Sequence, residues 1–237
     1  MHASCCEGQG TRLFGSLPSF VFTTVPPAAP GAAFTAYVDL YSPATLTFAA
    51  PGGVAASLTI DTLWPQAAHV NLMLQLAAPL AAGALELAVR IPSWLAAPAA
   101  VSVNGAPFGA PGAPGSYVHV IGAWPAGASV VSLDLPLSWD AALYAGHSQL
   151  PPYKRYSYLL GPILMSLEGP WDAASDSLVM PTGLDPSSPA QWLLPAGDGS
   201  ALHFTVKGTS GAGLIIAKPY FEVNEAGERF SNYPCFS

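Results

Sequence analysis

The residues best suited to chemistry in this sequence are two adjacent cysteines, Cys5 and Cys6, near the N-terminus. The chain of 237 residues has one further cysteine, Cys235. Thiolates are nucleophiles and zinc ligands, whereas three cysteines, two of them adjacent, do not make the disulfide framework of a secreted domain. The pair therefore predicts metal binding or nucleophilic chemistry. On residue type alone, two inert thiols or a strained vicinal disulfide stay open as alternatives.

A helix is expected to position the two thiols. Ser4 and Glu7 have the spacing of a capping box, which places both cysteines in a first helical turn, where a thiolate is favoured. Residues 11–22 predict the helix itself, because apolar side chains recur there at the spacing of one helical face. Gly8, Gly10, Gly15 and Pro18, within or near this stretch, favour a short or kinked helix that packs against something larger.

After a Pro- and Ala-rich linker at residues 25–31, the sequence predicts an antiparallel β-sandwich. Apolar and polar residues alternate in short runs that are separated by turn residues such as Asn104-Gly105. The runs follow one another too closely for crossover helices to lie between them. The expected strands are residues 35–41, 57–61, 71–76, 85–91, 101–103, 117–121 and 130–135.

The C-terminal part differs in character. Residues 156–167 form a strongly apolar segment, residues 170–198 read as irregular, and two last strands are expected at residues 201–207 and 213–217. The fold class is therefore mainly β. The expected domains are a helical segment at residues 1–24, the sandwich at 25–150 and a smaller β-rich region at 151–237.

Composition excludes two classes of function. The net charge is −7 and the seven Lys and Arg residues are scattered, so a nucleic-acid surface, which needs clustered cations, is not expected. Hydrophobic residues make up 51% of the chain, but their runs are far shorter than the roughly 20 residues of a membrane-spanning helix. The first residues show no targeting signal, which leaves the compartment of this soluble chain open.

Several short motifs occur together behind the cysteine pair. The motifs are Arg90-Ile91-Pro92-Ser93-Trp94, Val103-Asn104-Gly105, Pro114-Gly115-Ser116-Tyr117, Trp124-Pro125-Ala126-Gly127, Leu135-Pro136-Leu137 and Gly161-Pro162-Ile163. In this order and company they resemble the β-L-arabinofuranosidase-like proteins of glycoside hydrolase family 127, over residues 4 to 167. One departure is the turn Glu7-Gly8-Gln9-Gly10, which differs from the proline-rich or Gly-Thr-Gly turn of that family.

This resemblance implies a site and a layout. Most glycosidases pair two carboxylates, whereas here Cys5 would be the nucleophile of a retaining reaction, and Cys5 and Cys6 would bind zinc. The short helix would be the last of an (α/α)6 barrel. The acid/base glutamate and a Glu-x-Cys zinc pair would lie upstream, since no Glu-x-Cys occurs in this sequence. The chain alone is then expected to be inactive. The substrates would be arabinofuranoside-containing glycans, and a homodimer is possible.

Two other classes of function remain open: a stand-alone carbohydrate-binding or structural β-module, and a zinc- or redox-linked interaction protein. Cys235 is expected to be a lone thiol instead of a third ligand. His69 and His119 are expected to be satisfied by local hydrogen bonds, and Arg90 to anchor a turn or a domain contact. Glu86 and Asp134 are expected to face solvent. Trp94 and Trp124 are expected to fill the core instead of stacking on sugars.

Overall fold

The computed structural model describes residues 10, 12–13, 15–29, 31–146, 151–172, 177–223, 230–232 and 234–236. Cys5 and Cys6 lie outside the described residues, so their place in a helical turn stays a prediction. The chain divides into two compact units, Met1–Pro136 (unit 1) and Leu137–Ser237 (unit 2). The sequence-based domain limits place a boundary after residue 150, which falls within unit 2.

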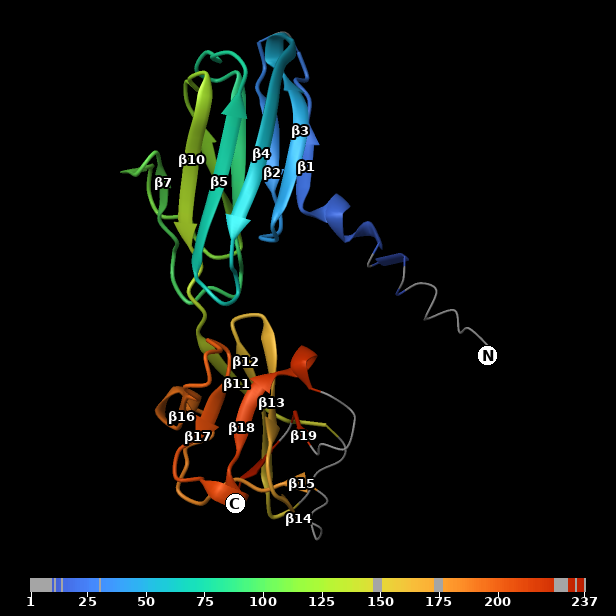
Figure 1. Ribbon diagram of the computed structural model, residues 1–237, viewed down its shortest axis with the longest axis vertical. Coiled ribbons are helices and arrows are strands. Elements are labelled where there is room, and N and C mark those ends of the chain that lie inside the picture. Colours follow the sequence, from blue (N-terminus) through green and yellow to red (C-terminus); the bar gives the residue numbers. More distant parts are fainter. Residues whose placement is uncertain are drawn as a thin grey trace. The chain divides into compact units, whose positions relative to one another are not determined.

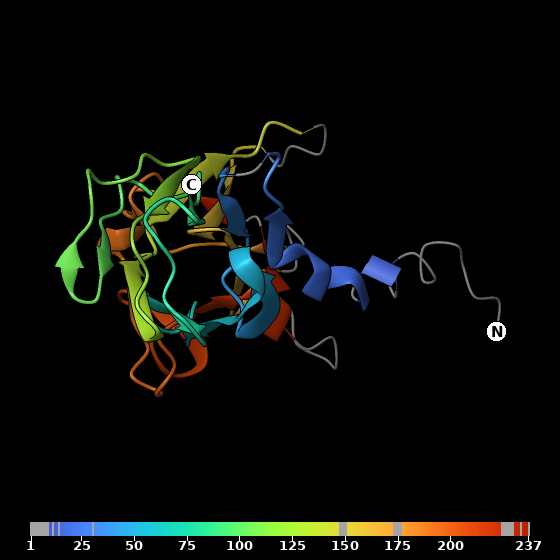
Figure 2. The same ribbon diagram turned by 90° about the horizontal axis from the view of Figure 1, so that it is seen from above.

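Residues 10, 12–13 and 15–16 are helical, and the 3-10 helix η1 (Leu17–Phe20) follows. Strand β1 then occupies Phe22–Val25, so the prediction of a helix through residue 22 and a linker from residue 25 was wrong at both limits. Pro18 cannot donate a helical hydrogen bond, and the β-branched run Thr23-Thr24-Val25 favours a strand. The described helical residues and η1 extend away from the strands of unit 1 in two perpendicular views (Figures 1 and 2).

Unit 1 is a β-sandwich of two sheets. The four-stranded sheet has the order β1-β2-β6-β9, with β2 at Phe34–Val38, β6 at Leu85–Ile91 and β9 at Ser116–Ile121. The six-stranded sheet has the order β3-β4-β5-β10-β7-β8. Its strands are β3 (Ala44–Ala50), β4 (Val54–Thr62), β5 (His69–Leu76), β7 (Val101–Val103), β8 (Ala106–Pro107) and β10 (Gly127–Asp134). The predicted mainly β, antiparallel architecture is confirmed, with one exception: β2 and β6 run parallel.

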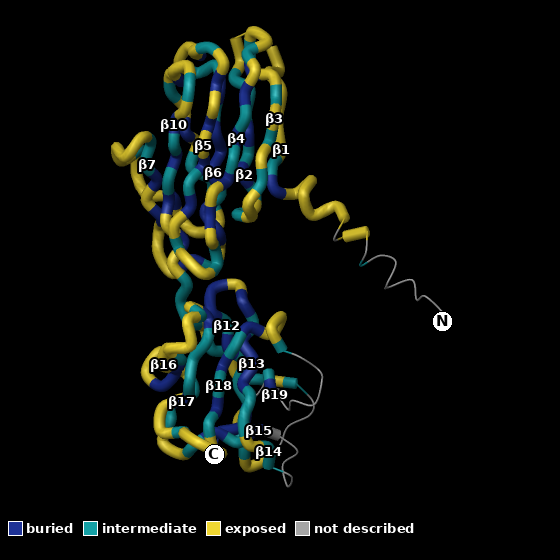
Figure 3. The backbone as a smooth tube through the Cα atoms, in the orientation of Figure 1, coloured by how far each residue is buried: buried dark blue, intermediate teal, exposed yellow. Residues whose placement is uncertain are grey.

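The core of unit 1 lies between the two sheets. Alternate residues of β5 point inward, and Val70, Leu72 and Leu74 have no exposed surface. Dark buried stretches along the strands contrast with the exposed N-terminal segment in Figure 3. Trp124 is 3% exposed, and the partly buried Trp94 packs against the same core. Both tryptophans therefore fill the core, as expected.

Unit 2 is built on one large sheet in the order β11-β12-β13-β18-β17-β16. The apolar segment at residues 156–167 is a hairpin of β12 (Lys154–Leu160) and β13 (Ile163–Glu168), which reverses at Gly161, where φ is 59°. Trp192 and Tyr158 form the centre of its core, with ring centroids 5.4 Å apart. The other strands of this sheet are β11 (Trp139–Leu143), β16 (Leu193–Pro195), β17 (Phe204–Val206), β18 (Ile216–Pro219), β19 (Phe230–Ser231) and β20 (Cys235–Phe236).

Short elements complete the described chain. The stretch at residues 170–198 is not wholly irregular, because β14 (Trp171–Asp172) pairs with β15 (Ser177–Leu178) and the 3-10 helix η3 (Pro189–Gln191) precedes β16. The remaining 3-10 helices are η2 (Pro51–Gly53), η4 (Gly211–Gly213) and η5 (Tyr220–Glu222). In the described part of the chain, every helix is too short to cross a membrane.

Candidate functional site

The predicted catalytic and zinc residues, Cys5 and Cys6, are outside the described residues, so the structure gives no geometry for them. Cys235 is fully buried in β20. Among the residues that the structure does describe, no group of three or more His, Cys, Asp or Glu side chains could hold a metal ion. In unit 1, the described polar side chains instead form a hydrogen-bond network around Asp39.

Asp39 is held by all four strands of the smaller sheet. It follows the last residue of β2, and the parallel register that pairs Val38 with Val89 brings it beside Arg90 of β6. Thr23 Oγ1 of β1 donates to Asp39 Oδ2 at 2.7 Å, and Tyr117 Oη of β9 donates to Oδ1 at 2.6 Å. Arg90 Nη1 donates to the Asp39 carbonyl oxygen at 3.1 Å. Arg90 therefore anchors the chain where it leaves β2, as expected for this residue.

Two tyrosines in this network are donors at neutral pH. The hydrogen bond to Asp39 raises the pKa of Tyr117 above its ordinary value. Burial raises the pKa of Tyr41, whose hydroxyl donates to the Arg90 carbonyl oxygen. A phenol with a raised pKa stays protonated, so both hydroxyls hold their acceptors without adding charge.

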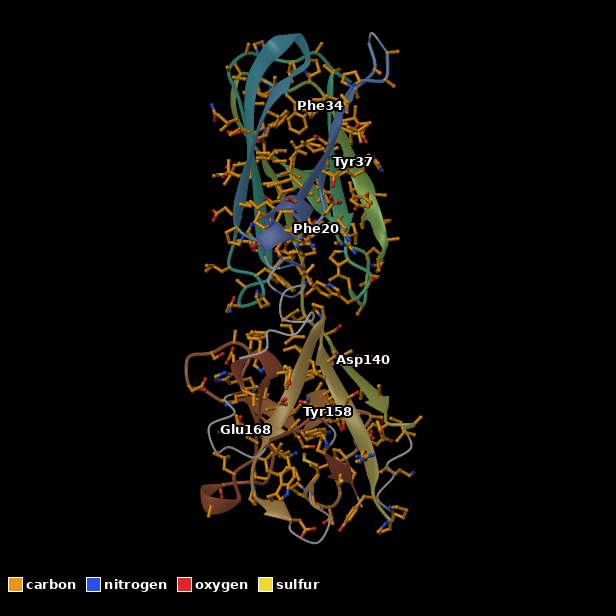
Figure 4. The ribbon with its side chains drawn as sticks, turned by 90° about the vertical axis from the view of Figure 1, so that its right-hand side faces the viewer. Phe20, Phe34, Tyr37, Asp140, Tyr158 and Glu168 are labelled. Carbon is orange, nitrogen blue, oxygen red and sulfur yellow. The ribbon has the colours of Figure 1, made fainter. Side chains whose placement is uncertain are left out.

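A hollow of about 510 Å³ opens beside this network. Phe20 and Leu40 supply its apolar surface and are 50% and 38% exposed. Gly115 forms part of its wall and has a φ of 81°, a conformation that suits glycine. The full lining is Phe20, Thr23, Asp39, Leu40, Arg90, Gly115 and Tyr117. Figure 4 labels Phe20, the last residue of η1, and Tyr37, whose ring meets that of Tyr117 edge-on with centroids 5.5 Å apart.

Each described histidine contacts a carboxylate. His69 Nδ1 lies 2.8 Å from Asp134 Oδ1, and His119 contacts Glu86 across β6 and β9, which confirms the expected local hydrogen bonds. The side chain of Asp134 is 71% exposed as predicted. That of Glu86 is only 15% exposed, so its predicted solvent-facing position was wrong. Thr35 and His119 flank it on the neighbouring strands.

A histidine in unit 2 was not singled out from the sequence. His203 lies between two acids: its Nδ1 is 2.6 Å from Asp198 Oδ2, and its Nε2 is 2.6 Å from Glu222 Oε2. The hydrogen bond to Glu222, then that to Asp198, raises the pKa of His203. Asp198 is five residues away in the sequence, but Glu222 reaches the ring only through tertiary structure, so spacing alone could not reveal the arrangement.

The motifs of the sequence serve the fold at defined points. Asn104 and Gly105 turn the chain between β7 and β8 with φ values of 49° and 78°, and Asn104 Oδ1 accepts a hydrogen bond from Val130 N. Trp124 Nε1 donates to the Leu85 carbonyl oxygen at 3.0 Å. Tyr117 is the motif residue that reaches the Asp39 carboxylate. These motif residues thus fix turns and join strands of unit 1.

Comparisons with known proteins agree with this architecture. A solved glycoside hydrolase has a TM-score of 0.66 and 20% identity, with 98% of this chain and 40% of that chain covered. A GH127 β-L-arabinofuranosidase from Geobacillus stearothermophilus T6 has a TM-score of 0.66 and 17% identity. A further GH127 β-arabinofuranosidase has a TM-score of 0.63 and 18% identity. In these two, 99% of this chain matches 38% and 39% of the other chain.

The chain thus spans about two fifths of the length of these solved structures. A comparison with curated protein sequences found no match. The family profile described as β-L-arabinofuranosidase, GH127 middle domain, matches residues 35–137, which hold both sheets of unit 1 except β1 and the first residue of β2. Residues 35–137 of this chain therefore resemble the middle domain of glycoside hydrolase family 127.

Proposed function

We propose that this chain is part of a retaining glycoside hydrolase that acts on β-L-arabinofuranosides, with Cys5 as the nucleophile. The observation that carries the proposal is the family match over residues 35–137, directly behind the segment that begins with the cysteine pair. The named relatives include β-arabinofuranosidases, which points to arabinofuranoside-containing glycans as the substrate class.

The proposed roles follow from thiol chemistry. Cys5 would attack the anomeric carbon as a thiolate and displace the leaving alcohol, to which the upstream acid/base glutamate would give a proton. The same glutamate would then take a proton from water, which would break the C–S bond and release the sugar with retained configuration. An ordinary thiol, with a pKa of about 8.5, is mostly protonated at neutral pH and so needs activation. Bound zinc would keep both thiols deprotonated. Cys5 and Cys6 would supply two of the four ligands that zinc prefers, and the other two ligands and the acid/base glutamate would come from upstream sequence.

The test is hydrolysis of a chromogenic β-L-arabinofuranoside. The 237-residue chain is compared with a polypeptide that adds whatever coding sequence lies in frame before Met1. We expect hydrolysis only by the longer polypeptide, and its loss in Cys5→Ser. Cys235→Ala is the matched control, because it removes a thiol that lies in unit 2. Hydrolysis by the shorter chain, or full activity of Cys5→Ser, would contradict the proposal.

A further inference from the structure

We propose that the hollow beside Asp39 binds one sugar residue of a neutral glycan, and that Phe20, Asp39 and Arg90 make the main contacts. The proposed hydrolysis assigns these three residues no role in binding a sugar. The inference does not depend on that hydrolysis either, because binding is measured without turnover.

The polar groups of the hollow match the hydroxyls of a sugar. A carboxylate has about four acceptor positions, and the described contacts of Asp39 use one on each oxygen, for Thr23 and Tyr117. A guanidinium has five N–H donors, of which Arg90 gives one to the Asp39 carbonyl oxygen within the described structure. Acceptors and donors thus remain side by side, as a ring with several hydroxyls requires.

The charges of the hollow favour a neutral ligand. Asp39 and Arg90 are the two charged residues in its lining. An anion would approach the Asp39 carboxylate and a cation the Arg90 guanidinium, and each encounter would be unfavourable. A sugar hydroxyl accepts from one group and donates to the other, so it uses both.

The apolar part of the hollow suits the C–H face of a sugar ring. Phe20 is 50% exposed and Leu40 is 38% exposed, although large apolar side chains of folded domains are mostly buried. The volume of about 510 Å³ lies within the range of small-molecule sites. Because strands and hydroxyl donors already hold Asp39, little side-chain ordering is needed on binding.

The exposed tryptophans that a sugar platform would need are not in this position. Trp124 and Trp192 are 3% and 2% exposed, so their faces are covered by the cores of the two units. The aromatic residues in the lining of the hollow are Phe20 and Tyr117, and Phe20 is the more apolar of the two.

The experiment is saturation-transfer NMR and calorimetric titration of the 237-residue chain with methyl β-L-arabinofuranoside. We expect binding with a Kd of about 1–10 mM. Phe20→Ala should weaken it about three- to tenfold, because an aromatic contact is lost. Asp39→Asn should weaken it about tenfold or more, because charged hydrogen bonds are lost. L-Arabinonate, which is anionic and of similar size, should bind more weakly than the neutral sugar.

Phe221→Ala is the matched control, since Phe221 is an exposed phenylalanine of unit 2, with 66% of its surface accessible. It should leave binding unchanged. Circular dichroism shows whether Asp39→Asn still folds, and the exposed position of Phe20 makes Phe20→Ala informative in either case. Absence of sugar binding, equal affinity of Phe20→Ala, or tighter binding of L-arabinonate would overturn the inference. None of these results bears on Cys5 hydrolysis.

Discussion

Trp124 donates its indole hydrogen to the carbonyl oxygen of Leu85, 3.0 Å away, and so ties the loop before β10 to the first residue of β6. The ring is 3% exposed. Trp124→Phe should keep much of the packing but leave a buried carbonyl without its donor, at a cost of about 1–3 kcal/mol in the free energy of unfolding. Trp124→Ala should cost about 3–5 kcal/mol.

Urea unfolding at constant pH measures both effects. Leu63→Ala serves as the control, because Leu63 is 73% exposed and its truncation should change stability by less than about 0.5 kcal/mol. If Trp124→Phe and Leu63→Ala had the same free energy of unfolding, the indole hydrogen bond would not contribute to stability.

Two glycines of unit 1 offer a matched pair of substitutions. A Cβ on Gly112 would lie 2.4 Å from Val118 Cγ2 and 2.6 Å from Ile91 Cγ1, whereas one on Gly122 would meet no atom within 4 Å. Gly112→Ala should therefore lower the free energy of unfolding by about 1–3 kcal/mol through overpacking. Gly122→Ala should be close to neutral. A thermal melt of both variants tests this, and similar melting temperatures would show that Val118 and Ile91 yield easily.

The hydrogen bonds of His203 to Asp198 and Glu222 predict that the stability of unit 2 depends on pH. The pKa of His203 is raised in the folded state, so protonation of this side chain stabilises the fold. This stabilisation is complete below the pKa of an unfolded histidine, about 6.5, and is lost as pH rises through the raised pKa. The pKa of Asp198 is lowered, chiefly by the hydrogen bond from His203, so its contribution is lost as pH falls through that lowered pKa. His203→Gln should thus lower the melting temperature more at about pH 6 than at about pH 9.

His69→Gln is the comparison for this experiment. The side chain of His69 is 55% exposed, against 22% for His203, and an exposed pair contributes less to stability. The same loss of melting temperature for His203→Gln at both pH values would contradict the predicted role of protonation.

Zinc affinity tests the proposed division of the metal site. Two thiolates supply half of a four-ligand site, so the 237-residue chain should bind zinc more weakly than about 1 μM. Competition with a chromogenic zinc chelator measures the affinity. Micromolar or tighter binding that is lost in Cys6→Ser would show that this chain supplies a complete site.

Local alternation predicted the strands of unit 1 well, because a half-buried strand has a strict period of two. Residues 85–91 and 101–103 are β6 and β7 with the predicted limits. Strand β3 was missed, since its run ATLTFAA contains alanines that carry little hydrophobic contrast. The predicted helix was too long, because Phe22 is the first residue of β1. Its apolar side chains are also less buried than the pattern suggests, since Leu13 and Leu17 are 56% and 41% exposed.

The site was less accessible to sequence reasoning. Arg90 stood out through its motif, but Asp39 did not, because its neighbours Thr23 and Tyr117 are far away in the sequence. Only the parallel register of β2 with β6 and the antiparallel register of β6 with β9 bring them together. Strand pairing of this kind depends on the whole sheet, and the sequence of one strand does not show which strand it will pair with.

The parallel pairing of β2 with β6 also constrains the order in which the chain can fold. During synthesis β1 and β2 leave the ribosome first, whereas β6 follows only after β3, β4 and β5, which pair among themselves as hairpins of the other sheet. Contacts between such distant segments form slowly, because a long loop must close before they are gained. The strands next to the cysteine pair are therefore anchored late, and a chain interrupted before Leu85 would leave the edge of β2 open to the wrong partner.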